Sequence, residues 1–286
     1  MSKTRFDYIG STDIAWCPGC GNYPLLALLK QSLEELDIDP KNLVISSGIG
    51  QAAKMPQYVR SNFFNGLHGR GLSVAVAIKV ANPELTVIAE GGDGDMYGEG
   101  GNHFIHNIRR NADIVHLVHN NMVYGLTQGQ ASPTSRRGFK TPVQTEGVIN
   151  EPFNPLAVAI ALGAPFVART FVGNAELTKN IIKQAIQYPG YALVDIFDPC
   201  VSFNKLNTFQ WYKENTYVIE ETHDPTNRMQ AMAKAFEDSP FPIGILYRSD
   251  EHKPTITQLL PAYDVDTRPL WKRPQRTAEA LSALML

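Results

Sequence analysis

Residues 85–134 carry the pattern that most constrains how this chain folds. The apolar run 85–89 is typical of a buried strand, and the glycine-rich turn after it contains Asp93. A polar-faced helical segment follows, and a second apolar run, 114–118, leads to Asn121. The pattern predicts a strand–turn–helix–strand unit in a parallel sheet, where the carboxyl ends of neighbouring strands meet at one edge. Open α/β sheets bind cofactors at that edge, so we expect Asp93 and Asn121 to face a cofactor.

The residues around Asp93 suit a phosphate held through a divalent cation. Gly92 and Gly94 have no side chain, so the main chain can approach a phosphate closely there. A carboxylate and a carboxamide are hard oxygen ligands of the kind that Mg²⁺ binds. The alternative is an ordinary glycine turn followed by an unrelated asparagine, because such turns are common. Asp95 is either a further ligand or a carboxylate that caps the turn.

Length and composition describe a chain that can bury a large core. It has 286 residues, of which 43% are hydrophobic and 19% charged, as is typical of a globular protein rather than a disordered one. The formal net charge of −2 gives no sign of a nucleic-acid partner. We see no secretory signal and no apolar run long enough to cross a membrane. The three cysteines exclude a disulfide framework that uses all of them, and we expect a reducing cytoplasm.

Helix and strand patterns alternate along most of the chain. Besides the unit described above, they predict helices at 24–36, 68–80, 155–162 and 175–187, strands at 43–46, 165–169 and 191–197, and, more weakly, a helix near 225–237 and a strand at 243–248. This alternation predicts an α/β fold with a doubly wound, mostly parallel sheet. Residues 125–142 are typical of a long functional loop. We expect residues 1–200 to form the cofactor-binding domain and residues 201–286 to form an extension that wraps this core or contacts a partner.

The spacing of the glycine turn and the asparagine resembles the thiamine-diphosphate motif, since Asn121 follows Asp93 by 28 positions. Further segments extend the resemblance to one family, the β subunits of the 2-oxoacid:ferredoxin oxidoreductases. The matching segments are Trp16–Gly21, Ser47–Gly50, Leu67–Arg70, Gly91–Asp95, Tyr124–Thr127, Gly129–Thr134 and Pro199–Cys200. The resemblance spans roughly residues 16–212, and several of the segments are long and rare.

The resemblance implies the reaction and the cofactors. Members of this family convert a 2-oxoacid, coenzyme A and oxidised ferredoxin into acyl-coenzyme A, carbon dioxide and reduced ferredoxin, using thiamine diphosphate and Mg²⁺. By the resemblance, Asp93, Asn121 and the carbonyl of Val123 bind Mg²⁺. The residues expected at the coenzyme are Gly48, Ile49, His68, Gly92, Asp93, Gly94, Asp95, Asn121, Val123, Tyr124, Gly125, Leu126 and Thr127.

Two residues are candidates for direct roles in the reaction. The resemblance implies that His68 contacts the diphosphate at the start of its helix; the alternative is a histidine hydrogen-bonded to the backbone there. Lys54 matches a lysine placed to attract the substrate carboxylate, and a surface lysine is the alternative. The loop that opens at Tyr124 resembles that of members that accept 2-oxoglutarate or a range of 2-oxoacids more than that of pyruvate-specific members. Gln128 stands where some broad-range members have lysine. We expect 2-oxoglutarate as the substrate, with a broad range of 2-oxoacids or pyruvate as alternatives.

The cysteines match ligands of an iron–sulfur cluster. Cys17 and Cys20 form a CxxC pair, and Cys200 follows Pro199, as the resemblance implies for a four-iron (4Fe-4S) cluster. Gln51 stands where the family has the fourth cysteine, and an amide is a poor iron ligand beside thiolates. The fourth iron would be bound by the Gln51 oxygen, by water or by nothing. A zinc site or uncommitted thiols are the alternatives.

The active site is incomplete in this chain. Thiamine enzymes use a glutamate that hydrogen-bonds the aminopyrimidine ring, and in this family it belongs to the pyrimidine-binding domain of the partner α subunit. No second α/β domain is evident here, so we expect a heterodimer in which this chain alone is inactive. Two other functions stay open: a subunit of a non-oxidative 2-oxoacid decarboxylase, and a non-catalytic assembly or electron-transfer subunit.

Overall fold

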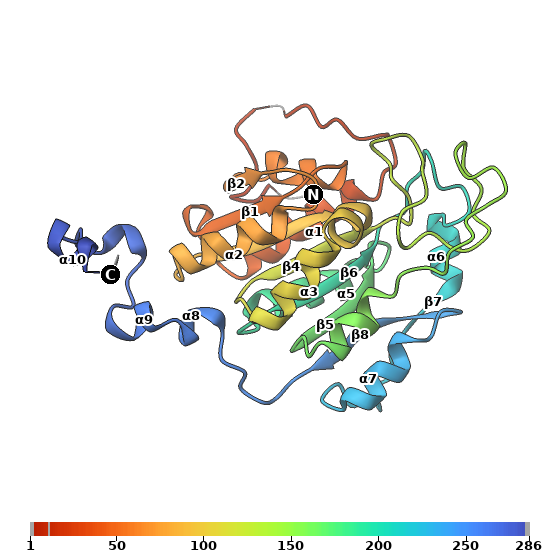
Figure 1. Ribbon diagram of the computed structural model, residues 1–286. Helices are drawn as coiled ribbons and strands as arrows, with labels where there is room; N and C mark the ends of the chain where they lie inside the picture. Colours follow the sequence, from red (N-terminus) through yellow and green to blue (C-terminus); the bar gives the residue numbers. More distant parts are fainter. Residues whose placement is uncertain (1–2, 11, 284–286) are drawn as a thin grey trace.

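The structure is a computed structural model and describes residues 3–10 and 12–283. Within these residues, eight strands form one sheet in the order β2–β1–β3–β4–β6–β5–β8–β7 (Figure 1). β8 runs antiparallel to β5, and the other neighbouring strands are parallel. The strands are β1 (Leu43–Ser47), β2 (Asn62–Asn65), β3 (Thr86–Gly92), β4 (Val115–Asn120), β5 (Phe166–Phe171), β6 (Ala192–Phe197), β7 (Thr216–Val218) and β8 (Phe241–Arg248).

Helices pack on both faces of the sheet and enclose two apolar cores. Leu117 of β4 belongs to the core beneath one helix layer, and its neighbour Val118 belongs to the core on the opposite face. This follows from the alternation of side chains along a strand. The first layer contains α1 (Asn22–Glu35) and α5 (Ala175–Gln187); the second contains α2 (Gly71–Ala81), α3 (Gly101–Arg110), α4 (Pro155–Ala161) and α7 (Arg228–Ala235).

Local sequence accounts for the helices. α1 buries Leu25, Leu29 and Leu33, whose spacing of four residues places them on one apolar stripe. α4 and α5 each begin after an asparagine, Asn154 and Asn174, whose side chain accepts a hydrogen bond from the backbone amide three residues on. Such caps satisfy amides that have no partner inside the helix, which fixes where the helix begins.

The expected α/β class and the doubly wound, mostly parallel sheet are confirmed. One helix boundary is wrong: the helix expected from His68 begins at Gly71, because Gly69 adopts a positive φ of 73° and its amide bonds a side chain instead. The strands β2 and β7, the helix at Phe209–Asn215 and two short irregular helices, η2 (Ala52–Tyr58) and η3 (Gly94–Glu99), were not predicted. Elements this short leave little periodic signal in a sequence.

Residues beyond 200 contribute to the sheet before they leave it. β7 and β8 form one end of the sheet, after α6 (Phe209–Asn215). The chain then runs through short helices near one end of α2 (Figure 1). There the hydroxyl of Tyr263 donates a hydrogen bond to the carbonyl of Val80. These helices are α8 (Ile256–Leu259), α9 (Pro261–Val265), η4 (Leu270–Lys272) and α10 (Ala278–Ser282). Over the described ranges, no helix is long and apolar enough to span a bilayer.

Candidate functional site

The central feature of the site is the edge where β3 and β4 end. The two strands are parallel neighbours in which Gly92 aligns with His119, so both finish at the same edge. Asp93 follows β3 directly, and Asn121 follows β4 directly. Both side chains line one pocket, as the sequence predicted.

Most residues expected at the coenzyme line this pocket, which we call the edge pocket. Those that do are Ile49, His68, Gly92, Asp93, Gly94, Asp95, Asn121, Val123, Tyr124, Gly125, Leu126 and Thr127; Gly50, Gln51 and Ala52 line it as well. Gly48 lies just behind the wall, where a Cβ would fall 2.3 Å from Oδ2 of Asp95. Lys54 is half-buried on η2 and does not line the pocket. The structure therefore brings the set together except for Gly48 and Lys54.

Asp93 is a buried carboxylate held by the loop that follows β4. Its Oδ2 accepts hydrogen bonds from Oγ of Ser132 and Oγ1 of Thr134, both at 2.5 Å. Burial raises the pKa of Asp93 to about 6, although these hydroxyls favour the ionised form. A carboxylate at this depth is destabilised without a compensating positive charge. The arrangement fits a cation ligand at Asp93.

The two hydroxyls also fasten the loop, and sequence reasoning assigned them no role. Thr134 Oγ1 also lies 2.9 Å from Oδ1 of Asn120, and the Ser135 hydroxyl donates to the carbonyl of Met122 at 2.6 Å. The loop is therefore pinned at residues 132–135 both to Asp93 and to the end of β4. Ser132 and Thr134 belong to the segment Gly129–Thr134, which carries part of the family resemblance. That membership was the signal in the sequence that could have indicated their role.

Asp95 organises the turns around the pocket. Its Oδ1 accepts hydrogen bonds from the amides of Gly69 at 2.7 Å and Ile49 at 3.2 Å. Burial raises its pKa, and those amides oppose the shift. Of the two interpretations left by the sequence, these contacts favour the turn-capping carboxylate over a metal ligand. Nδ1 of His68 lies 3.5 Å from the same oxygen, and its ring lines the pocket from the loop before α2.

Tyr124 explains why residue 94 is glycine. Its hydroxyl donates to the carbonyl of Gly94 at 3.3 Å, and its ring covers the turn. A Cβ at Gly94 would lie 2.1 Å from Cε1 of that ring. At Gly92 a Cβ would meet nothing nearer than 3.8 Å, so the fold does not demand glycine there. Open space at Gly92 is what close approach of a diphosphate to the main chain requires.

The three cysteines line a second pocket beside the first. Cys17, Cys20 and Cys200 come from two distant segments and are free thiols. Burial, reinforced by the charge of Asp198 and by the other two cysteines, raises the pKa of Cys20 to about 12. The amide of Phe203 donates to Sγ of Cys200 at 3.4 Å, a contact of the kind that supports iron–sulfur ligands.

No three His, Cys, Asp or Glu side chains in the described ranges are already grouped around a metal position. The cysteine pocket nonetheless fits a cluster, because its thiols are uncommitted and a cation would relieve the cost of ionising Cys20. The edge pocket fits Mg²⁺ with one carboxylate, one amide and backbone oxygen, and Mg²⁺ needs few protein ligands when phosphates complete its shell.

Gln51, Asn121 and Gly125 line both pockets and form their shared wall. The Asn121 Oδ1 accepts a hydrogen bond from the amide of Val123 at 3.0 Å, which fixes that side of the wall. The backbone carbonyl of Gln51 accepts from the Trp16 indole at 2.8 Å. A group bound in one pocket therefore lies next to a group bound in the other.

A buried polar group lies beneath this wall and was not found by sequence reasoning. Nδ1 of His119 contacts Oδ1 of Asn22 at 2.7 Å, and its Nε2 lies 3.4 Å from Glu90. Burial lowers the pKa of His119 to about 3 and raises that of Glu90 well above its usual value, so burial disfavours the charged form of both side chains. Burial likewise raises the pKa of Asp198 to about 8, with the charge of Asp93 adding to the effect.

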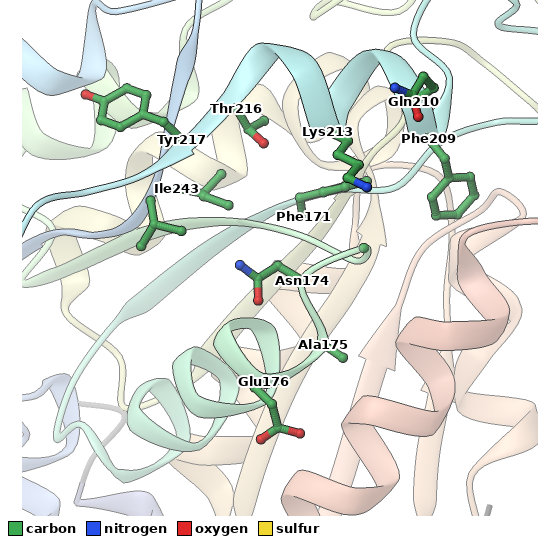
Figure 2. A pocket seen from close by; sticks show the side chains of 12 residues that line it. Phe171, Asn174, Ala175, Glu176, Phe209, Gln210, Lys213, Thr216, Tyr217 and Ile243 are labelled. Carbon is green, nitrogen blue, oxygen red and sulfur yellow. The ribbon is translucent and has the colours of Figure 1, made fainter.

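A separate open hollow of about 670 Å³ lies between α5, α6 and β8 (Figure 2). Phe171 at the end of β5 contributes to its apolar lining, and Lys213 of α6 contributes a cation. It contains none of the residues predicted for the site, and β6 stands between β5 and the strands that carry Asp93 and Asn121. Most of the residues expected at the coenzyme, and all three cysteines, line the two smaller pockets instead.

Comparison with known proteins agrees with this geometry. Residues 46–196 match the family model of the thiamine pyrophosphate enzyme C-terminal TPP-binding domain, and residues 200–265 match the model of the C-terminal part of the pyruvate ferredoxin oxidoreductase β chain. Subunit β of 2-oxoacid:ferredoxin oxidoreductase 1 from Aeropyrum pernix is 40% identical over 269 residues, which cover 89% of this chain and 85% of that protein. The 2-oxoglutarate synthase subunit KorB of Methanocaldococcus jannaschii is 34% identical over 217 residues, covering 73% and 80%.

A solved structure is also similar over nearly the whole chain. It is a 2-oxoglutarate:ferredoxin oxidoreductase from Magnetococcus marinus with 2-oxoglutarate, coenzyme A and succinyl-CoA bound. The TM-score is 0.89 at 34% identity, with 98% of this chain and 94% of that chain covered.

Fold and site together define an α/β protein of the thiamine pyrophosphate enzyme class. Within that class, the chain belongs to the β subunits of the 2-oxoacid:ferredoxin oxidoreductases. The family expected from the motifs is confirmed.

Proposed function

We propose that this β subunit is the thiamine-diphosphate- and Mg²⁺-binding catalytic subunit of an enzyme that oxidatively decarboxylates 2-oxoglutarate. The products are succinyl-coenzyme A and carbon dioxide, and a pair of electrons passes through an iron–sulfur cluster to ferredoxin. The observation that carries the proposal is the pairing of the buried Asp93 with the half-buried Asn121 in a pocket that shares a wall with the cysteine pocket. An oxidative decarboxylation needs both a coenzyme site and an adjacent route for electrons.

The residues of the edge pocket divide the work of holding the coenzyme. Thiamine diphosphate, when bound, supplies the carbon nucleophile and the electron sink for decarboxylation. Asp93, Asn121 and the Val123 carbonyl would hold Mg²⁺, and the open space at Gly92 admits the diphosphate. His68 lines the same pocket, where its ring can donate a hydrogen bond to a phosphate oxygen.

The remaining contacts act on the coenzyme ring and on the substrate. The loop residues Tyr124, Gly125, Leu126 and Thr127 line the pocket and would exclude water from the reacting carbon. Lys54 would attract the substrate carboxylate from η2 once the α subunit covers the site. Cys17, Cys20 and Cys200 would hold the cluster across the wall.

The choice of 2-oxoglutarate rests on relatives. The KorB proteins are named for 2-oxoglutarate, and the Magnetococcus marinus enzyme was solved with that acid bound. The name of the β subunit implies an α subunit, which would supply the pyrimidine-binding domain and its glutamate. We therefore expect activity from the complex and none from this chain alone.

The test is anaerobic purification of the complex followed by a screen of 2-oxoacids with coenzyme A, measuring acyl-coenzyme A and reduced ferredoxin. 2-Oxoglutarate should give the highest kcat/KM. Asp93→Ala should abolish Mg²⁺-dependent thiamine diphosphate binding in calorimetry, whereas Asp250→Ala, at an exposed position, should leave it intact.

Two results would overturn the proposal in different ways. Carbon dioxide release without ferredoxin reduction, from a complex that contains no iron, would indicate a non-oxidative decarboxylase, which is the alternative that Gln51 favours. Absence of thiamine diphosphate binding by the wild-type complex would indicate a non-catalytic assembly or electron-transfer subunit.

A further inference from the structure

We propose that the iron–sulfur cluster of this chain has three cysteine ligands and that its fourth iron is bound by the side-chain amide oxygen of Gln51. The inference rests on the proposed function, because it presumes that the cysteine pocket holds a cluster. It makes Gln51 a ligand and places the exchangeable corner of the cluster at the wall shared with the edge pocket. The proposal depends on the position of Gln51, on its missing partner and on the commitments of its neighbours.

Gln51 is placed in both pockets by a fixed backbone. It immediately precedes η2, and its carbonyl is held by the Trp16 indole at 2.8 Å. The residue lines the cysteine pocket together with Cys17, Cys20 and Cys200. Its position therefore places Gln51 beside whatever group the three thiols bind.

The amide oxygen of Gln51 has no partner. Among the described residues, Oε1 is buried and accepts no hydrogen bond. Buried acceptors are almost always satisfied, and one that is not indicates a missing water or ion. A cation held by the three thiolates next to it would satisfy this oxygen.

Two of the other side-chain oxygens that line the cysteine pocket are engaged. Asn22 Oδ1 is bonded to His119 at 2.7 Å, and Asn121 Oδ1 accepts the Val123 amide at 3.0 Å. Asp198 and Ser202 also line the pocket, and Oδ1 of Asp198 is, among the described residues, buried without a hydrogen-bond partner. The Asp198 carboxylate and the Ser202 hydroxyl are therefore the competitors that the experiment must exclude.

A neutral amide at one corner changes the chemistry of the cluster. Oxygen binds iron more weakly than thiolate does in such sites, so the fourth iron exchanges more readily than the three held by cysteine. Replacing one thiolate by a neutral ligand also leaves the site less negative by one charge, which favours reduction. On oxidation, Fe²⁺ leaves the Gln51 corner and one electron passes to the oxidant, giving a three-iron cluster on the cysteines.

The experiment compares wild-type, Gln51→Cys, Gln57→Cys, Asp198→Asn and Ser202→Ala complexes, each purified anaerobically with the α subunit. Gln57 is the matched control, because it is an exposed glutamine on the same η2 turn that lines neither pocket. Each complex is titrated with ferricyanide, and iron content, EPR and Mössbauer spectra are recorded before and after. Binding of thiamine diphosphate is measured in parallel by calorimetry.

We expect the wild-type complex to lose one iron of four and to develop the EPR signal of a three-iron cluster, which added Fe²⁺ reverses. Gln51→Cys should keep all its iron under the same oxidant and show a lower reduction potential. Gln57→Cys, Asp198→Asn and Ser202→Ala should behave as wild type.

Several outcomes would overturn the inference. They are full iron retention by the wild type, equal protection by Gln57→Cys, an exchangeable iron with the wild-type spectrum in Gln51→Cys, or zinc in place of iron. A changed spectrum of that iron in Asp198→Asn or Ser202→Ala would also overturn it. If thiamine diphosphate still binds in these cases, only the cluster assignment fails. Loss of that binding in the wild type would instead contradict the proposed function.

Discussion

Asp93→Asn should have opposite effects on the empty chain and on coenzyme binding. Burial raises the pKa of Asp93 from 3.8 to about 6 in the metal-free protein. A shift of about two pKa units corresponds to about 3 kcal/mol of cost for the ionised form in the folded state. The amide has one hydrogen-bond acceptor fewer than the carboxylate, and this loss offsets about 1 kcal/mol of the gain in stability. The metal-free variant should therefore be more stable than wild type by about 2 kcal/mol at neutral pH.

The pH dependence fixes the sign of this effect. Below pH 3.8 both the folded and the unfolded chain hold the proton, so Asp93 imposes no cost. Between pH 3.8 and about 6 the unfolded chain ionises first, and the stability of the wild type falls as pH rises. Above that range the cost is constant. The advantage of the variant should thus be absent near pH 4 and complete by about pH 7.

Urea unfolding of the full chain in a chelator, at several pH values, measures the first effect. Calorimetric titration of the complex with Mg²⁺ and thiamine diphosphate measures the second, where Asp93→Asn should bind too weakly to detect. Asp250→Asn serves as the control, because Asp250 is exposed. Equal stability of the variant and wild type at about pH 7, or unchanged coenzyme binding, would refute the assignment of Asp93 as a desolvated cation ligand.

Three further predictions concern contacts in the core and the turn. Gly94→Ala should destabilise the chain strongly because its Cβ would lie 2.1 Å from an aromatic ring, while Gly92→Ala should keep the fold; equal urea midpoints for the two would contradict this. Asp195→Ala should lower the free energy of unfolding by about 3–5 kcal/mol. The reason is that the buried guanidinium of Arg169, which lies 2.9 Å from the Asp195 carboxylate, would lose its partner. An unchanged urea midpoint would argue against this role. Burial raises the pKa of Glu90 well above its usual value, so wild-type stability should fall as pH rises past about 4.5, and Glu90→Gln should remove that slope; superimposable pH profiles would argue against it.

The fold was predictable because its elements carry strong periodic signals. The structure places several elements within a few residues of their predicted ranges: α1, with its leucines, and the apolar strands β1, β3, β4 and β6. The weak points were short or irregular elements. β2 exposes all four of its residues and has no alternation to detect, and the start of α2 depends on a bond between Gly69 and Asp95 that no local pattern encodes.

The candidate site was predictable only where residues follow a strand end or belong to a motif. Asp93 and Asn121 could be placed together because parallel neighbours end at one edge. The distant partners could not, since Ser132 and Thr134 reach Asp93 across a loop without secondary structure. The contact of His119 with Asn22 joins residues 97 positions apart and depends on tertiary packing alone.

The hydrogen bonds that hold residues 132–135 divide the long loop after β4 into two stretches with different surroundings. The stretch before it contributes Gly125, Leu126 and Thr127 to the edge pocket, whereas the stretch after it reaches the surface, where Arg137 and Glu151 pair in water. Insertions or exchanges in the outer stretch would leave the inner one in register with the reacting centre. Specificity for an acid and compatibility with a neighbouring protein could therefore diverge in evolution without disturbing each other.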